Sequence, residues 1–335
     1  MPGNTGVARV PGAVAGCLYI DVYVNVHPPR MPSSAAPAST QPLRPLRGVR
    51  VLSLALNLPG PAALMRLKAM GATCLKAEPP APQGAPAGTS GDPMGQYNAQ
   101  GYGQLHAGIR VVTIDLKSEA GQARLHQALA RTDVLLTSFR PSALQKLGLG
   151  WKALHRQHPA LSVVAIYGAP GERAEEPGHD LTYLADAGLV TGLDLPATLF
   201  ADMGGALMAS EAVLQAVIQQ QRTGKSSFQS VALSDAAAWL ALPRVWGLTQ
   251  PSGSVGGAHA GYRVYPCKNG RVALAALEPH FAAALCAVAG IPFHGMATML
   301  HPDTPAAIAA FLAGKTRAQL DKLAARHDIP LHTLA

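Results

Sequence analysis

The stretch that decides the fold is Gly48-Val-Arg-Val-Leu-Ser-Leu-Ala-Leu56, a run of mostly apolar residues that is followed by Pro59-Gly60. A short apolar run bounded by turn residues is typical of a buried strand, and proline at the next position favours a helix start. Gly71 ends that helix, and a second strand is expected over 73–77. The segment therefore predicts a strand-helix-strand unit.

The same alternation continues downstream. Strands are expected over 110–116, 134–137 and 161–167, and helices from Ser118, over 141–157 and over 202–221; a long Pro- and Gly-rich loop is expected through about Gly103. Repeated β-α units imply a parallel, Rossmann-like sheet. Pro59-Gly60 does not fit the dinucleotide fingerprint GxGxxG, and the turn at Thr223-Gly224-Lys225-Ser226 lacks the upstream glycine of a P-loop.

The pattern changes after about Trp246. Two strands flank the turn Asn269-Gly270, and helices are expected from Pro279, Thr304 and Thr316. We therefore predict an α/β protein with a large Rossmann-like domain over 43–248 and a smaller α+β domain over 249–335. Residues 1–42 are rich in Pro, Ser and Ala and are expected to be a disordered extension, with Met31 as the natural start.

Composition limits the classes of function. The net charge is +8, but no Lys/Arg run or basic aromatic stripe accompanies it, so an anionic small molecule fits better than nucleic acid. No segment approaches the roughly 20 uninterrupted apolar residues of a membrane span. The four cysteines show neither a disulfide framework nor metal-ligand spacing. These observations predict a soluble, cytoplasmic protein without a metal site.

Four residues form a candidate acid/base site in a chain that is only 14% charged: His179 and Asp180 after Gly178, Asp202 before Gly204-Gly205, and Glu278 before Pro279. Imidazole and carboxyl groups are the usual proton-transfer groups of enzymes. From spacing alone, however, the carboxylates are equally explained as residues at helix starts, and the histidine as a surface residue.

In this order the motifs resemble the family III CoA-transferase superfamily (CaiB/BaiF-like), and within it most closely the α-methylacyl-CoA racemases. The resemblance runs from about Leu46 to the C-terminus, and its pieces are Gly48-Val-Arg-Val-Leu, Pro59-Gly60-Pro61, Lys76-Ala-Glu-Pro-Pro, Asp115-Leu-Lys117, Phe139-Arg140-Pro141, Leu147-Gly-Leu-Gly150, Gly178-His-Asp180, Ala201-Asp202, Arg222-Thr-Gly-Lys225 and Glu278-Pro-x-Phe281.

The resemblance implies an interlocked homodimer in which each active site lies between the large domain of one chain and the small domain of the other. It also implies racemase residues at His179, Asp202 and a supporting Glu278. Transferase members typically have an aromatic residue before the aspartate that acts as the covalent nucleophile, here Asp180. Since this chain has histidine in that place, the resemblance favours a racemase.

The implied chemistry is inversion at the carbon next to a thioester. His179 and Asp202 would alternate as acid and base on opposite faces of an enolate. Coenzyme A would enter as part of the substrate, with no tightly bound cofactor. Its phosphates are expected at Lys76, Arg110, Arg140 and Lys146, which we expect on one side of the sheet.

The chain departs from the family in three places: Leu105-His-Ala-Gly-Ile-Arg110, Gly168-Ala-Pro-Gly-Glu172, and its end at Ala335, where a segment returning to the large domain is expected to be missing. Two alternatives to the 2-methylacyl-CoA racemase therefore stay open. One is a CoA-transferase that uses Asp180. The other is a degenerate paralogue that binds CoA esters or a partner protein without catalysis.

Overall fold

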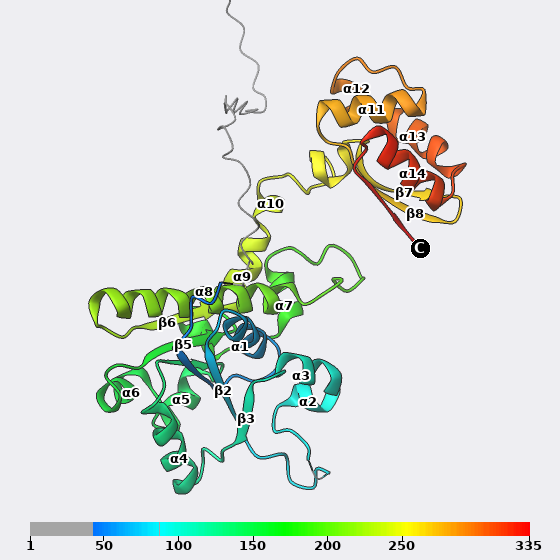
Figure 1. Ribbon diagram of the computed structural model, residues 1–335. Coiled ribbons are helices and arrows are strands. Elements are labelled where there is room, and N and C mark those ends of the chain that lie inside the picture. Colours follow the sequence, from blue (N-terminus) through cyan, green and yellow to red (C-terminus); the bar gives the residue numbers. More distant parts are fainter. Residues whose placement is uncertain (1–42, 87) are drawn as a thin grey trace, which may run out of the picture. The chain divides into compact units, whose positions relative to one another are not determined.

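The computed structural model describes residues 43–86 and 88–335 (Figure 1). The predictions about the extension over 1–42 and a start at Met31 lie outside the described residues. Among the described residues, no helix combines the length and the apolar character that crossing a bilayer requires.

Six parallel strands form the large sheet, in the order β3-β2-β1-β4-β5-β6. This is the strand order of a doubly wound Rossmann-like sheet, so the predicted α/β fold is confirmed. Strands β1 to β3 are added toward one edge of the sheet and β4 to β6 toward the other, so the strand order switches between β1 and β4, where such sheets open a crevice at the carboxyl ends of their strands. The strands are β1 Arg50–Ser53, β2 Thr73–Glu78, β3 Arg110–Thr113, β4 Val134–Thr137, β5 Ser162–Tyr167 and β6 Phe228–Ala232.

Helices cover both faces of this sheet. On one face, α1 (Pro59–Ala69) and α8 (Phe200–Thr223) pack against each other, and their buried residues join one hydrophobic core. On the other face, the core includes residues of α4 (Glu119–Leu129), α5 (Pro141–Lys146) and α6 (Trp151–Gln157). The remaining helices of this part are α2 Pro93–Tyr97, α3 Ala99–Leu105, η1 Gly171–Glu175, α7 Asp180–Asp186, α9 Leu233–Leu240 and α10 Leu242–Val245.

The expectation of a structureless loop through about Gly103 is wrong, because this segment contains α2 and α3. Asp92 caps α2 by accepting a hydrogen bond from the Met94 amide at 3.0 Å, and Asn98 caps α3 through the Gly101 amide at 2.8 Å. Side-chain acceptors at the N-cap satisfy amides that have no partner within the helix, so these polar residues help even short helices to form.

A second sheet, antiparallel and three-stranded, forms the C-terminal part. The predicted hairpin at Asn269-Gly270 is present, with Cys267 opposite Gly270. Its core draws on residues between Ala260 and Leu331 and shares none with the two cores of the large sheet, while the predicted domain boundary near 248 stays a prediction. The elements are η2 Ser254–Ala258, β7 Tyr262–Cys267, β8 Gly270–Ala275, α11 Pro279–Ala289, α12 Ala297–Leu300, α13 Thr304–Ala313, α14 Arg317–His327 and β9 Leu331–Leu334.

Candidate active site

A cavity of about 170 Å³ lies at the carboxyl ends of β1, β4 and β5. His179 and Asp202 both line it, so the structure brings together two of the predicted site residues from segments more than twenty positions apart. The other polar or aromatic side chains around it are Asn57, Ser138, Arg140, Tyr167, Glu176 and Tyr183. Its position is the crevice that a doubly wound sheet offers to ligands.

His179 precedes the first residue of α7 and has an extended backbone, with φ −142° and ψ 170°. The Thr182 hydroxyl fixes that backbone from both sides: it accepts from the His179 amide at 3.1 Å and donates to the His179 carbonyl at 2.7 Å. The residue is exposed. Its backbone is therefore held while its imidazole can reach a ligand.

Asp202 lies in the first turn of α8 and is partly buried. Burial raises the pKa of its carboxyl to about 6, the nearby Asp180 carboxylate adds to this rise, and His179 opposes it. A carboxyl group with such a pKa has both its acid and its base form accessible near neutral pH. The positive end of α8 favours the ionised carboxylate, but its effect on the pKa of Asp202 is smaller than that of burial.

Asp180 differs from His179 and Asp202 because its side chain is 4% exposed and does not line the cavity. Its Oδ1 accepts a hydrogen bond from the Asp202 amide at 3.0 Å. This bond joins the start of α7 to the first turn of α8. It also occupies the Asp202 amide, so this amide does not face the cavity as a free donor.

Two tyrosines belong to the same surroundings, although the sequence did not point to them. Burial raises the pKa of both Tyr183 and Tyr97, and the charge of Asp202 raises each of them further. Asn57 was missed as well. It lies between the strand and helix of the first β-α unit and has φ 63°, a left-handed backbone that asparagine tolerates better than most residues.

Arg140 and Lys146 lie at the two ends of α5, and Arg140 lines the cavity. Both are exposed. They also face the same carboxylate: hydrogen bonds from Ser142 lower the pKa of Glu175, and the charges of Arg140 and Lys146 lower it further. Both side chains are thus accessible to solvent and place positive charge near Glu175.

The expectation that Arg110 shares this side of the sheet is wrong. Arg110 is the first residue of β3 and therefore lies at the amino ends of the parallel strands, at the edge opposite His179. There it lines a separate cavity of about 720 Å³ together with Arg50, Arg124 and Arg131. A ligand bound between His179 and Asp202 would lie at the opposite, carboxyl ends of the strands.

Lys76 is not open to a phosphate in this structure either. Its side chain is 0% exposed, and its ammonium is bonded to Glu78, Asp92 and His106. These three partners have donor atoms within 4.8 Å of one another, a spacing that suits a metal ion. The Lys76 ammonium already occupies all three, and it provides the positive charge that the two carboxylates need.

Glu278 directly precedes α11 and is exposed, without a hydrogen bond from its side chain to the helix start. It belongs to the C-terminal part of the chain and does not line the cavity of His179 and Asp202. The structure thus brings His179 and Asp202 together and leaves the predicted role of Glu278 as a proposal.

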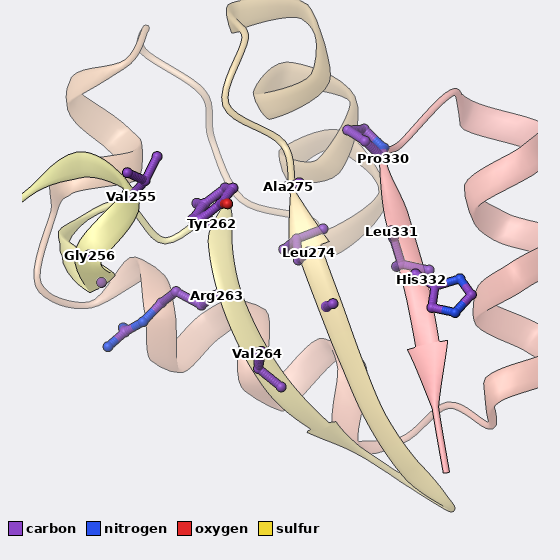
Figure 2. A pocket seen from close by; sticks show the side chains of 12 residues that line it. Val255, Gly256, Tyr262, Arg263, Val264, Leu274, Ala275, Pro330, Leu331 and His332 are labelled. Atoms are coloured by element: carbon purple, nitrogen blue, oxygen red, sulfur yellow. The ribbon is translucent and has the colours of Figure 1, made fainter. Parts of the chain in front are cut away.

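Two further cavities lie apart from this pair. One of about 670 Å³ lies against the β7-β8-β9 sheet, with Tyr262, Val264, Leu274 and His332 around it (Figure 2). It contains no carboxylate and so offers no acid/base pair of the same kind. The other, of about 130 Å³, lies at the carboxyl ends of β1 to β3; its lining is mostly apolar and includes Phe139 and Lys117.

The fold is thus a doubly wound α/β sheet that holds a histidine and a carboxyl group of raised pKa at its crevice. The chain belongs to the CoA-transferase family III, whose model matches residues 46–335.

A probable fatty acyl-CoA transferase of Mycobacterium tuberculosis is 32% identical over 60% of this chain and 54% of that protein, so the chain spans about half of its length. The α-methylacyl-CoA racemase of Mus musculus is 28% identical over 82% of this chain and 73% of the racemase. Among solved structures, a hypothetical protein from M. tuberculosis superposes with a TM-score of 0.74 at 25% identity, covering 88% of this chain and 86% of that one.

Proposed function

We propose that the protein acts on CoA thioesters as a 2-methylacyl-CoA racemase. The observation that carries this proposal is the placement of His179 and Asp202 in one cavity, while Asp180 is buried beneath it. A racemase needs two groups that can each give and take a proton, and a raised carboxyl pKa beside an accessible imidazole meets that need.

In the proposed reaction, one of the two residues removes the proton from the carbon next to the thioester carbonyl. The electron pair moves onto the carbonyl oxygen to form an enolate, and the other residue returns a proton to the opposite face. Because the Asp202 amide already donates to Asp180, other amides must stabilise the enolate oxygen. The start of α1 offers one such amide beside the cavity-lining Pro59, that of Gly60, since Pro59 and Pro61 have no N–H and the Ala62 amide donates to the Leu58 carbonyl.

For the CoA part, we propose that the apolar pocket beside Phe139 and Lys117 takes the adenine, and that Arg140 and Lys146 meet the phosphates. A planar, apolar base suits an apolar slot with a few polar groups at its edge. Lys76 does not belong to this set because it is buried, and Arg110 does not because it lies at the amino ends of the strands.

We also propose a homodimer in which Glu278 of the partner subunit supports His179. Several large apolar side chains of α8, α9 and α10 are exposed, which supports a protein surface covering them: Phe200, Met203, Leu207, Trp239 and Val245. Exposed apolar residues that gather in this way mark an interaction site more often than scattered ones do.

The test is exchange of the substrate's α-proton with solvent deuterium, followed by mass spectrometry over a panel of CoA thioesters. We expect His179→Ala and Asp202→Ala each to abolish the exchange, because each removes one of the two proton-transfer groups. His301→Ala and Asp303→Ala are matched controls, since both side chains are mostly exposed in the C-terminal part, and they should retain wild-type exchange. Undiminished exchange in either site variant would refute the two-base mechanism.

A CoA-transferase is the second candidate, supported by the names of several relatives and by the presence of Asp180. Its carboxylate would attack the thioester, release CoA thiolate and form an acyl anhydride, which hydroxylamine or borohydride would trap. Burial of Asp180 and its bond to the Asp202 amide oppose this role. Covalent trapping that disappears in Asp180→Asn would favour the transferase, whereas absence of acetyl-CoA binding in calorimetry would favour a non-catalytic paralogue that binds only a partner protein.

A further inference from the structure

A group of ionisable side chains is enclosed beside the candidate site and takes no part in the proposed proton transfer. Lys76 and Asp92 are each 0% exposed and form a direct ion pair. Glu78 lies 2.9 Å from the same ammonium, and so does Nε2 of His106. Burying charges is costly even when they are paired, so such a group is weak evidence for a purely stabilising role.

The hydrogen bonds around these charges are well satisfied. The Tyr102 hydroxyl donates to Glu78 at 2.8 Å, and the Ser90 hydroxyl donates to the other oxygen of Glu78 at 2.6 Å. Nδ1 of His106 lies 2.7 Å from the Tyr102 carbonyl, so it carries the proton and Nε2 accepts from Lys76. Burial lowers the pKa of His106, and the Lys76 charge lowers it further, which keeps the imidazole neutral. These bonds hold the segment over 90–106 against β2.

Asp92 connects this group to the cavity wall. Its second oxygen, Oδ1, accepts from the amides of Asn57 and Met94, both at 3.0 Å. Asn57 lines the cavity and has the left-handed backbone noted above. Met94 is the second residue of the short helix α2, which ends at Tyr97; burial raises the pKa of Tyr97, and the charges of Asp92 and Asp202 raise it further. One carboxylate therefore holds both the Asn57 turn at the cavity wall and the first turn of α2.

We propose that Asp92, oriented by Lys76, is a positioning residue that sets the Asn57 turn and α2, and through them the shape of the cavity around Asp202. Lys76 takes one oxygen of the carboxylate, which leaves the other aimed at the two amides. Without that acceptor, the Asn57 backbone loses the bond that holds it in an unfavourable conformation. This inference rests on the proposed function only for its kinetic test.

The kinetic test compares Asp92→Ala and Asp92→Asn with Thr316→Ala, which removes a helix cap of the same kind from α14 in the C-terminal part. Displacing a catalytic group by about 1 Å lowers the rate about 10²-fold. We expect a loss of that order in kcat for Asp92→Ala, a smaller loss for Asp92→Asn, little change in KM for either, and no loss for Thr316→Ala. Equal kcat in all folded variants would overturn the proposal.

A second measurement does not depend on activity and separates this inference from the proposed function. Hydrogen exchange followed by mass spectrometry should show faster exchange over residues 56–60 in the Asp92 variants and not in Thr316→Ala. An asparagine side chain has one acceptor oxygen and cannot serve both Lys76 and the two amides, so Asp92→Asn should show the effect even if Asp92→Ala does not fold. Unchanged exchange over 56–60 contradicts the positioning role, whereas a wild-type protein without α-proton exchange contradicts only the proposed function.

Discussion

At the residue scale, the candidate site depends on how differently two neighbouring aspartates are placed. Asp180 is almost fully enclosed and accepts the Asp202 amide, while Asp202 faces the cavity with its pKa raised by burial and by Asp180. The sequence suggested His179, Asp180 and Asp202 as site residues, but it could not show which carboxylate faces the cavity. That distinction arises from packing of α7 against α8, which no local pattern reveals.

The raised pKa of Asp202 has a consequence for stability. Its pKa in the folded protein is about 6 against an ordinary 3.8, so ionising it costs more in the folded than in the unfolded chain. Relative to wild type, Asp202→Asn should be more stable above pH 6 by about 3 kcal/mol, since the rise from 3.8 to about 6 is about 2.2 pKa units and each unit corresponds to about 1.4 kcal/mol. The gain should shrink as the pH falls from about 6 and vanish below 3.8, because both states of the wild type are then protonated.

Urea unfolding at several pH values measures this difference. The matched control is Asp303→Asn, whose side chain is 91% exposed and should show no pH-dependent gain. A gain for Asp202→Asn that is the same at low and at neutral pH would contradict a raised pKa.

At the element scale, most strands and long helices could be predicted from the sequence. The prediction for β4 matched its bounds, and the helix expected over 202–221 extends over Phe200–Thr223. α2 and α3 were missed because helices of five and seven residues are too short to show a periodic apolar face. The side of the sheet on which Arg110 lies follows from the sequence, because the first residue of a parallel strand lies at the amino end of the sheet.

The contact between α1 and the end of β1 is close enough to be tested through Gly60. A Cβ at this position would lie 2.1 Å from the Cβ of the fully buried Ala55, so Gly60→Ala must displace the helix or the strand end. We expect a loss of stability of about 1–3 kcal/mol, as for other overpacked sites.

Gly103→Ala is the control, because Gly103 lies in α3 with nothing within 4 Å of its added Cβ. Alanine is the better helix former, so this variant should be more stable than wild type by about 0.5–1 kcal/mol. Thermal unfolding of both variants compares them, and a Gly60→Ala protein as stable as Gly103→Ala would show that the α1 contact is looser than described.

At the scale of the whole molecule, the proposed homodimer can be tested by complementation. If one site takes His179 from one chain and Glu278 from its partner, a mixed dimer of His179→Ala and Glu278→Gln chains contains one intact site. Co-expression in equal amounts should then restore about a quarter of the wild-type exchange activity, since half of the dimers are mixed and each has one working site of two.

The two variants made separately provide the baseline, and purification through a different tag on each chain isolates the mixed dimer. Exchange that stays at the baseline in the isolated mixed dimer would show that both residues act within one chain. The sequence could suggest this arrangement only through its resemblance to a family, because contacts between subunits leave no periodic pattern in a single chain.

The enclosed group around Lys76 also restricts how this protein can diverge during evolution. Removing Lys76 would leave Glu78 and Asp92 as two buried carboxylates without their cation, which is far more damaging than losing the whole group. Substitutions at these positions are therefore coupled, and a lineage that loses Lys76 must change both carboxylates as well. Homologous sequences that lack Lys76 should also lack both carboxylates, a signature that can be read from sequences alone.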